Sequence, residues 1–193
     1  TTLGLAAGAT AALATQAEAE AGTNNTALMT PLRAAQHLQS ENLNLGTAVA
    51  STSGNSIDFT GIPSWAKRVT VILSGVATSA AQNYFIQIGT SGGIQATGYE
   101  GKTVFLQSAS TGTAAASTTG FQFNAIATAR HGTIVFSKPS GNIWVAAGNV
   151  NVQGNLLEVF AGYVALSGAL DRVRISAGTT ATFTAGSINI MWE

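Results

Sequence analysis

The run Leu156-Leu-Glu-Val-Phe-Ala-Gly-Tyr-Val-Ala165 predicts a β-strand, because branched and aromatic side chains fill most of it. Successive side chains of a strand point to opposite faces. Both faces are apolar here, one through Leu156, Phe160 and Val164 and the other through Leu157, Val159 and Tyr163. A strand that is apolar on both faces is expected to be covered on both. The run therefore predicts either a central strand under a loop or a strand at an interface between subunits.

This strand belongs to a long β region that begins after Gly46. Short runs of β-branched and aromatic residues alternate there with clusters of Gly, Ser, Thr and Asn, as in strands joined by turns. The predicted strands are residues 56–60, 68–76, 84–88, 103–107, 120–128, 133–137, 142–146, 156–165, 172–176 and 188–192. No helical segment separates them, so the pattern predicts an antiparallel sandwich or barrel. The expected fold class is mainly β, an antiparallel β-sandwich with a jelly-roll-like head.

Residues 14–38 precede the β region and carry two helix signals joined by a polar turn. The first runs over alanines between residues 14 and 21 and ends at Gly22, which suits the left-handed conformation of helix C-termini. The second opens at Thr30-Pro31, an N-cap followed by a first-turn proline. Helices this short are marginal in isolation. Because their alanines permit close approach, a second copy of the chain is the simplest packing partner.

The low charge of the chain also predicts self-association. Only 8% of the residues are charged, against about 25% in ordinary globular domains, while 46% are hydrophobic. A soluble surface of this composition is expected to be partly hidden. The candidate interface residues lie on the second helix and on the doubly apolar strand: Leu32, Leu38, Leu157, Val159 and Tyr163. The predicted domains are a helical stalk segment, residues 1–45, and a β head, residues 46–193.

Several classes of function are disfavoured by composition. The net charge is zero and basic residues form no dense cluster, so nothing directs the chain to nucleic acid or to an anionic membrane. There are no cysteines, hence neither disulfides nor zinc–thiolate sites. No apolar run approaches the roughly 18–20 residues of a membrane-spanning helix.

Three parts of the sequence resemble bacteriophage tail fibres. Residues 14–36, with ATQAEAEAGT followed by NT and MTPLR, are similar to a linker that precedes the distal domain of such fibres. Residues 59–76, FTGIPSWAKRVTVILSGV, are similar to the opening strands of that domain. Residues 170–174 and 187–193 are similar to its end. Residues 79–155 match no known segment, and in such a fibre they are where host specificity is expected to vary.

The resemblance implies a homotrimer in the virion, joined to upstream tail fibre or baseplate proteins. Its head is then expected to attach the virion to a bacterial surface polysaccharide, or another surface receptor, by non-catalytic multivalent binding. Such binding needs neither cofactor nor metal. Three copies of His37 around a threefold axis would offer ligands to a metal, but a histidine favoured by the dipole at a helix C-terminus is the simpler interpretation.

Sugar binding needs an exposed aromatic ring and a few polar groups. The leading candidate is Tyr99-Glu-Gly-Lys102, expected to lie in a loop, where Tyr99 supplies a ring, Glu100 an acceptor and Lys102 a donor. The second candidate is Trp144, which falls within a predicted strand. Two further tryptophans, Trp65 and Trp192, lie in the fibre-like segments and are expected to be core residues.

A polysaccharide-depolymerising tailspike and a purely structural baseplate or tail component are the alternative functions. Glycoside hydrolysis needs two carboxylates roughly 5–10 Å apart. The acids of the β region are not adjacent in sequence: Asp58, Glu100, Glu158, Asp171 and Glu193. Burial of Glu158 within its apolar strand is expected to raise its pKa, but a satisfied structural glutamate is the simpler interpretation. We therefore expect no enzymatic activity; reducing-end release from polysaccharide is the measurement that distinguishes a tailspike.

Overall fold

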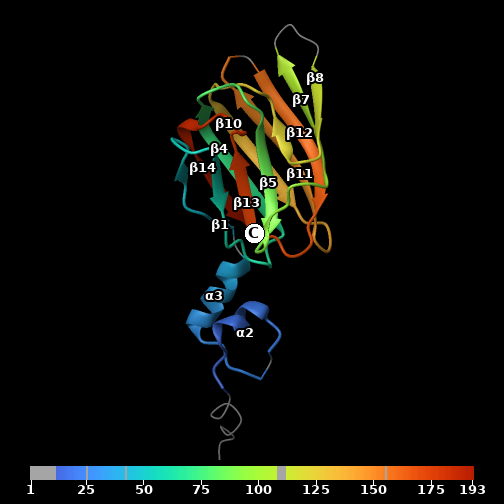
Figure 1. Cartoon of the computed structure of the whole chain (residues 1–193). Coiled ribbons are helices and arrows are strands. Elements are labelled where there is room, and N and C mark those ends of the chain that lie inside the picture. Colours follow the sequence, from blue (N-terminus) through green and yellow to red (C-terminus); the bar gives the residue numbers. More distant parts are fainter. Residues whose placement is uncertain (1–11, 25, 42, 108–111, 155) are drawn as a thin grey trace, which may run out of the picture. The chain divides into compact units, whose positions relative to one another are not determined.

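The computed structural model describes residues 12–24, 26–41, 43–107, 112–154 and 156–193 (Figure 1). The chain divides into two compact units, which meet in sequence between Asn44 and Leu45. The first, residues 1–44, is called the helical unit, and the second, residues 45–192, is called the β unit. The chain is mainly β and its sheets are antiparallel, as the sequence predicts.

The helical unit contains α2 (Gln16–Ala21) and α3 (Pro31–Glu41), where the sequence predicts them. Gly22 ends α2 in the left-handed conformation, with φ 62°. Thr30 Oγ1 accepts a hydrogen bond from Arg33 N at 3.2 Å, which confirms Thr30 as the N-cap of α3. The start of α2 is fixed by a capping box between Thr15 and Glu18 that the sequence analysis missed.

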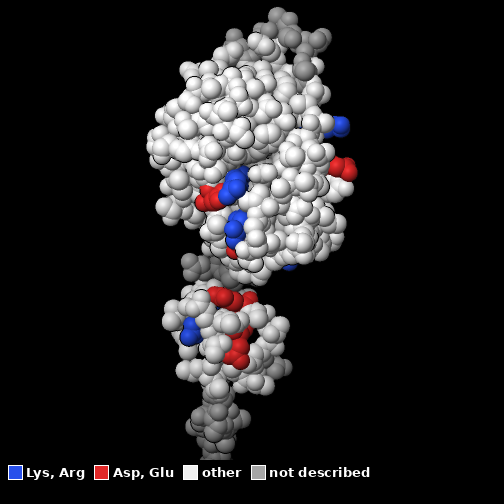
Figure 2. Space-filling view, viewed as in Figure 1, with Lys and Arg blue, Asp and Glu red and all other residues white. Residues whose placement is uncertain are grey.

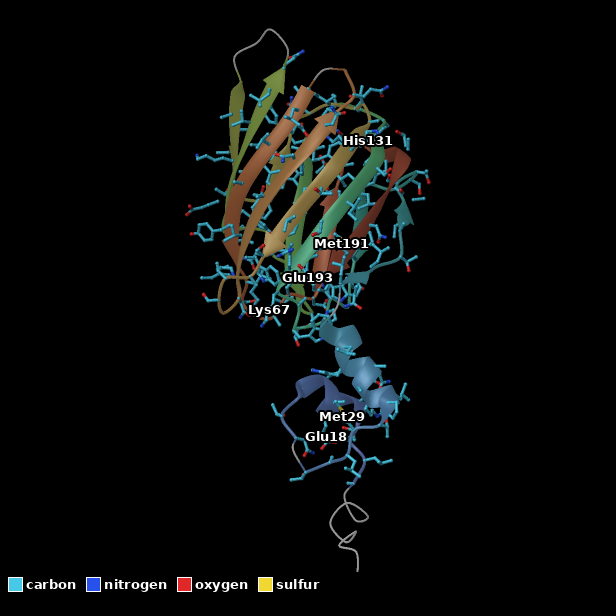
Figure 3. All side chains as sticks on the ribbon, turned by 180° about the vertical axis from the view of Figure 1, so that it is seen from behind. Glu18, Met29, Lys67, His131, Met191 and Glu193 are labelled. Atoms are coloured by element: carbon cyan, nitrogen blue, oxygen red, sulfur yellow. The ribbon has the colours of Figure 1, made fainter. Side chains whose placement is uncertain are left out.

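The larger sheet of the β unit has nine strands among the described residues. Their order is β1 (Asn44–Leu45), β14 (Phe183–Trp192), β4 (Arg68–Thr78), β10 (Arg130–Ser137), β11 (Ile143–Val152), β12 (Leu156–Ala165), β7 (Tyr99–Gln107) and β8 (Thr113–Ser117), with β2 (Val49–Ala50) also paired to β14. Figure 3 shows this sheet from its outer side, with His131 on β10 and Met191 on β14 labelled.

In the part of the chain that the structure describes, the smaller sheet has five strands. Their order is β3 (Ser56–Phe59), β13 (Arg172–Ser176), β5 (Tyr84–Thr90) and β6 (Gly93–Ile94), with β9 (Phe121–Phe123) also paired to β5. In Figure 1 this sheet lies in front, where β5 and β13 are labelled.

One hydrophobic core lies between the two sheets. It takes alternate residues from the larger sheet, such as Val71 and Ile134, and from the smaller sheet, such as Ile86 and Val173, all with no exposed surface. The period-two pattern of the sequence therefore marks the inward face of most strands correctly. Trp65 and Trp192 pack against this core while remaining partly exposed, as expected of core-side residues.

Strand β12 is covered on one face within this chain. Leu156, Phe160 and Val164 lie in the core. On the opposite face Leu157 is 39% exposed and Tyr163 is 41% exposed. Of the two arrangements predicted for this strand, a covering loop is therefore excluded for the part of the chain that the structure describes.

Several strand predictions are wrong in extent. Strand β7 begins at Tyr99 rather than at residue 103, and β11 continues to Val152 rather than ending at residue 146. Strands β6 and β8 were not predicted, because Gly93–Ile94 is too short and Thr113–Ser117 is mostly alanine. In each case pairing to a neighbouring strand outweighs the weak local preference for extended backbone.

Candidate functional site

Tyr99 does not lie in a loop, so its predicted placement is wrong. It is the first residue of β7, and its ring is 1% exposed. Its hydroxyl donates to Ile88 O at 3.1 Å and accepts from Ile88 N at 2.9 Å. The ring meets Phe121 edge to face, with centroids 5.2 Å apart. Tyr99 therefore ties the two sheets together, and its ring is not available to stack on a sugar.

Trp144 is also a core residue, on β11, and its ring is 1% exposed. Lys138 Nζ lies 5.9 Å from the centre of the ring, which fits a weak cation–π contact. The strand alternates, so Ile143 and Val145 face outward instead, 40% and 45% exposed. The sequence left both faces possible for Trp144, and the structure places it inward, where it offers no surface to a receptor.

Replacing Tyr99 with phenylalanine is expected to lower the free energy of unfolding by about 1–3 kcal/mol, because the Ile88 N–H loses its buried acceptor. Burial also raises the pKa of the Tyr99 phenol above its ordinary value of 10.0. In the unfolded chain the phenol of Tyr99 loses its proton near pH 10, whereas the buried phenol keeps it. The contribution of Tyr99 to the free energy of unfolding is therefore present in full below pH 10 and is lost above it.

Urea unfolding between pH 8 and pH 11 checks this prediction. The fall in stability above pH 10 should be shallower for Tyr99→Phe than for the unaltered chain. Tyr163→Phe is the matched control, because that ring is 41% exposed; it should change stability at pH 8 by less than about 0.5 kcal/mol. Equal losses in the two variants would contradict a bridging role for Tyr99.

The other two residues of the predicted receptor segment, Glu100 and Lys102, are exposed on the outer face of β7. They line a hollow of about 620 Å³ between β7, β8 and β12, here called the β7 hollow. Its floor is made of small residues, including Ala116, Ala161 and Gly162. A Cβ at Gly162 would overlap the carbonyl oxygen of Glu100, so glycine is required for the strands to lie this close. The small side chains of this floor keep the hollow open.

Tyr163 stands beside this hollow and brings an exposed ring to it. It is the cross-strand neighbour of Glu100, and its hydroxyl donates to Glu100 Oε1 at 3.2 Å. The charge of Glu100 raises the pKa of Tyr163. The sequence predicts Tyr163 at a subunit interface and Glu100 in receptor binding. The structure brings the two together, which only the pairing register of β7 with β12 reveals.

An apolar area adjoins the β7 hollow on the same outer face. Neighbouring positions on β7 and β12 carry two cross-strand pairs, Leu106 with Leu157 and Val104 with Val159. Leu106 is 45% exposed and Val104 is 37% exposed. These four side chains are called the apolar patch. Ile143 and Val145 are also exposed on this face, but they lie opposite Ala165 and Tyr163, away from the patch. The four patch residues are an apolar area that a single chain leaves uncovered.

The carboxylates of the β unit are held by different partners. Asp58 is paired with Arg174 at 2.6 Å and Asp171 with Arg172 at 2.9 Å. Glu158 is fully buried, and burial raises its pKa, as the sequence predicts. Its partner is Arg130, also fully buried, at 3.3 Å. Sequence reasoning missed Arg130, because an arginine at the start of a strand ordinarily faces solvent.

No protein-family model matches the chain, and no curated protein is significantly similar to it. Neither of the described helices is long and apolar enough to cross a membrane. Among the described residues, no three His, Cys, Asp or Glu side chains gather closely enough to hold a metal ion. The geometry and chemistry of the surface are therefore the basis for a functional proposal.

Proposed function

We propose that this chain is the distal part of a bacteriophage tail fibre, and that the β unit is its receptor-binding head. The head binds a bacterial surface polysaccharide without cleaving it. The proposal starts from the resemblance of residues 14–36, 59–76, 170–174 and 187–193 to such fibres. The observation that carries it further is the β7 hollow, which is lined by the carboxylate of Glu100 and the ammonium of Lys102. The exposed Tyr163 ring is bonded to Glu100 beside it.

The chemistry of the β7 hollow suits an oligosaccharide. The Tyr163 ring offers an apolar surface to a sugar face, while Glu100 accepts and Lys102 donates hydrogen bonds to hydroxyls. Within the described residues Lys102 forms no ion pair, so its ammonium is available to a ligand. The side chains stand on paired strands of a rigid sheet, which lowers the entropic cost of binding.

We further propose that the head is a β-sandwich of jelly-roll type and that three copies associate. Two antiparallel sheets around one core support the sandwich. The apolar patch supports association on the β unit, since it is exposed in the single chain. On the helical unit, Leu32 and Leu38 are 63% and 61% exposed, so α3 also presents leucines to a partner. Copies joined in this way hold several receptor sites near one another, and avidity compensates for weak single sites.

Replacing Tyr163 with alanine is expected to weaken attachment to susceptible bacteria by about 1–3 kcal/mol per site, because the stacking ring is lost. The measurement is the binding of fluorescently labelled chain to susceptible and resistant cells. Tyr163→Phe keeps the ring and loses only the hydroxyl that bonds to Glu100, so it should retain most of the binding.

Light scattering on both variants controls for a change of assembly, since Tyr163 adjoins the apolar patch. Two results would refute the proposal at different levels. Equal labelling of susceptible and resistant cells by the unaltered chain would refute receptor binding. Undiminished binding of an intact Tyr163→Ala assembly would refute the β7 hollow as the site.

A further inference from the structure

The smaller sheet carries a second hollow, of about 420 Å³, on its outer face. It is here called the β5 hollow. It is lined from β3, β5, β13 and the adjoining loops by Ser56, Phe85, Gln87, Thr119, Arg174 and Ser176, among others. Figure 2 shows this side of the β unit, where few charged side chains interrupt a large uncharged surface. The sequence predicts none of these residues as a binding residue; Arg174 falls in the fibre-like segment 170–174.

The strands of the smaller sheet fix the side chains of the β5 hollow. Phe85 is the cross-strand neighbour of Ser176, and Gln87 is that of Arg174. They alternate along their strands with Ile86 and Ile175, which are fully buried in the core. The outward side chains therefore stand on backbone that the core holds rigidly.

Arg174 lines the β5 hollow, and its ion pair with Asp58 stands beside the hollow and is neutral overall. Arg174 Nε lies 2.7 Å from Asp58 Oδ1, and Arg174 Nη2 lies 2.6 Å from Asp58 Oδ2. This two-bond arrangement fixes both planar groups. About a third of each side chain is exposed. The carboxylate has further lone pairs, and in the described structure Arg174 Nη1 makes no hydrogen bond, so the pair can both accept from and donate to hydroxyls.

An aromatic ring also lines the β5 hollow. Phe85 is half-buried on β5, and the loop before β9 lies directly against it. A Cβ at Gly120 would lie 3.3 Å from Phe85 Cδ1 and 2.9 Å from Gln87 Cγ, so glycine lets this loop come close. Gln87 Nε2 donates to Thr119 O at 2.7 Å, which holds the loop in place and leaves the amide oxygen of Gln87 as an acceptor.

We propose that the β5 hollow is a second sugar-binding site of the head, specific for an uncharged, hydroxyl-rich segment of polysaccharide. A ring stacks on Phe85, while the Arg174–Asp58 pair and Gln87 bond its hydroxyls. Because the pair is neutral overall, it gives no preference for an anion or a cation. The β7 hollow differs, since Lys102 there has no ion-pair partner in the described structure. The inference rests on the proposed receptor-binding function and adds to it a separate site and a class of sugar.

The test uses an array of purified bacterial surface polysaccharides, with neutral and acidic members, probed with the labelled chain. Phe85→Ala should reduce binding to the neutral polysaccharides by about tenfold, the loss expected for one stacking contact. Phe85→Leu keeps an apolar side chain in place and removes only the ring, so it should lose binding to a similar extent without loss of stability. Thr133→Ala, on the outer face of the larger sheet, is the control and should bind normally.

The outcomes separate this site from the function on which it rests. If the unaltered chain binds neither the array nor susceptible cells, the proposed function fails, and this site with it. If the unaltered chain binds neutral polysaccharides and both Phe85 variants bind them equally well, the β5 hollow is not a sugar site, although the function stands. If binding of the Phe85 variants to acidic and to neutral polysaccharides falls equally, the specificity for uncharged sugars is refuted.

Discussion

Glu158→Gln is expected to lower the free energy of unfolding of the β unit by about 3–5 kcal/mol, because it leaves the charge of Arg130 buried without an opposite charge. The glutamine keeps the size of the side chain and an acceptor for Asn124 N, which now bonds to Glu158 Oε1 at 2.9 Å. The loss therefore measures the missing charge and not a cavity. Urea unfolding at neutral pH gives the value.

Glu100→Gln is the matched control, because it makes the same change on an exposed carboxylate of β7. It should alter stability by less than about 0.5 kcal/mol. If Glu158→Gln lost no more than this control, the buried pair would not be a determinant of stability.

Two further variants, Arg130→Met and the double variant Arg130→Met with Glu158→Met, distinguish the effect of the ion pair from that of the hydrogen bonds that Arg130 donates to the loop before β10. Arg130 also donates from Nη1 to Ile126 O at 2.7 Å and from Nη2 to Asn124 O, and its guanidinium lies 4.0 Å from the centre of the Tyr84 ring. Arg130→Met with Glu158→Met removes both charges, so it should be more stable than Arg130→Met alone. It should remain less stable than the unaltered chain, because Asn124 and Ile126 lose the partners of their backbone groups.

Leu157→Asp is expected to dissociate the proposed trimer while leaving the single chain folded. Leu157 lies in the apolar patch and is 39% exposed, so an aspartate there stays hydrated in the monomer but would be buried unpaired against a second copy. The mass measured by light scattering at micromolar concentration should fall from three times 19.5 kDa for the unaltered chain to 19.5 kDa for the variant. Circular dichroism should show the same β content in both.

The control for this prediction is Thr133→Asp, an equal charge placed on an exposed polar residue of β10 on the same face of the sheet. It should remain associated. A mass of 19.5 kDa for the unaltered chain would refute the proposed trimer outright. A trimeric Leu157→Asp variant would show instead that the apolar patch is not the contact surface.

The sequence predicts the elements of this fold where local preference and burial agree. Strand β12 and strand β13 are predicted with their observed bounds, since branched residues fill both. Strand β8 has the sequence Thr-Ala-Ala-Ala-Ser and is held by pairing with β7 alone, which no local signal shows. The sequence therefore predicts the core strands, but it does not predict the alanine-rich strand β8 at the edge of the larger sheet.

The candidate site is harder to predict than the fold, because it depends on register. Tyr99 and Tyr163 each follow a glycine, and Tyr99 precedes Glu100 whereas Tyr163 precedes Val164. Tyr99 is nevertheless the buried ring and Tyr163 the exposed one. Only the pairing of β7 with β12 decides which ring meets Glu100. The Arg174–Asp58 pair likewise joins residues 116 positions apart. Its partners become neighbours only when β13 pairs with β3.

The alternation of β5 and β13 has a consequence for the proposed receptor-binding head. Phe85 and Gln87 face outward, whereas Ile86 and Ile88, between and beside them, belong to the core. If the head binds receptors as proposed, outward positions of this kind can change one at a time without disturbing the core, although Gln87 also holds the loop at Thr119. Adaptation to a new bacterial coat would then proceed by single substitutions on the strands, without an insertion in a loop or a repacked core.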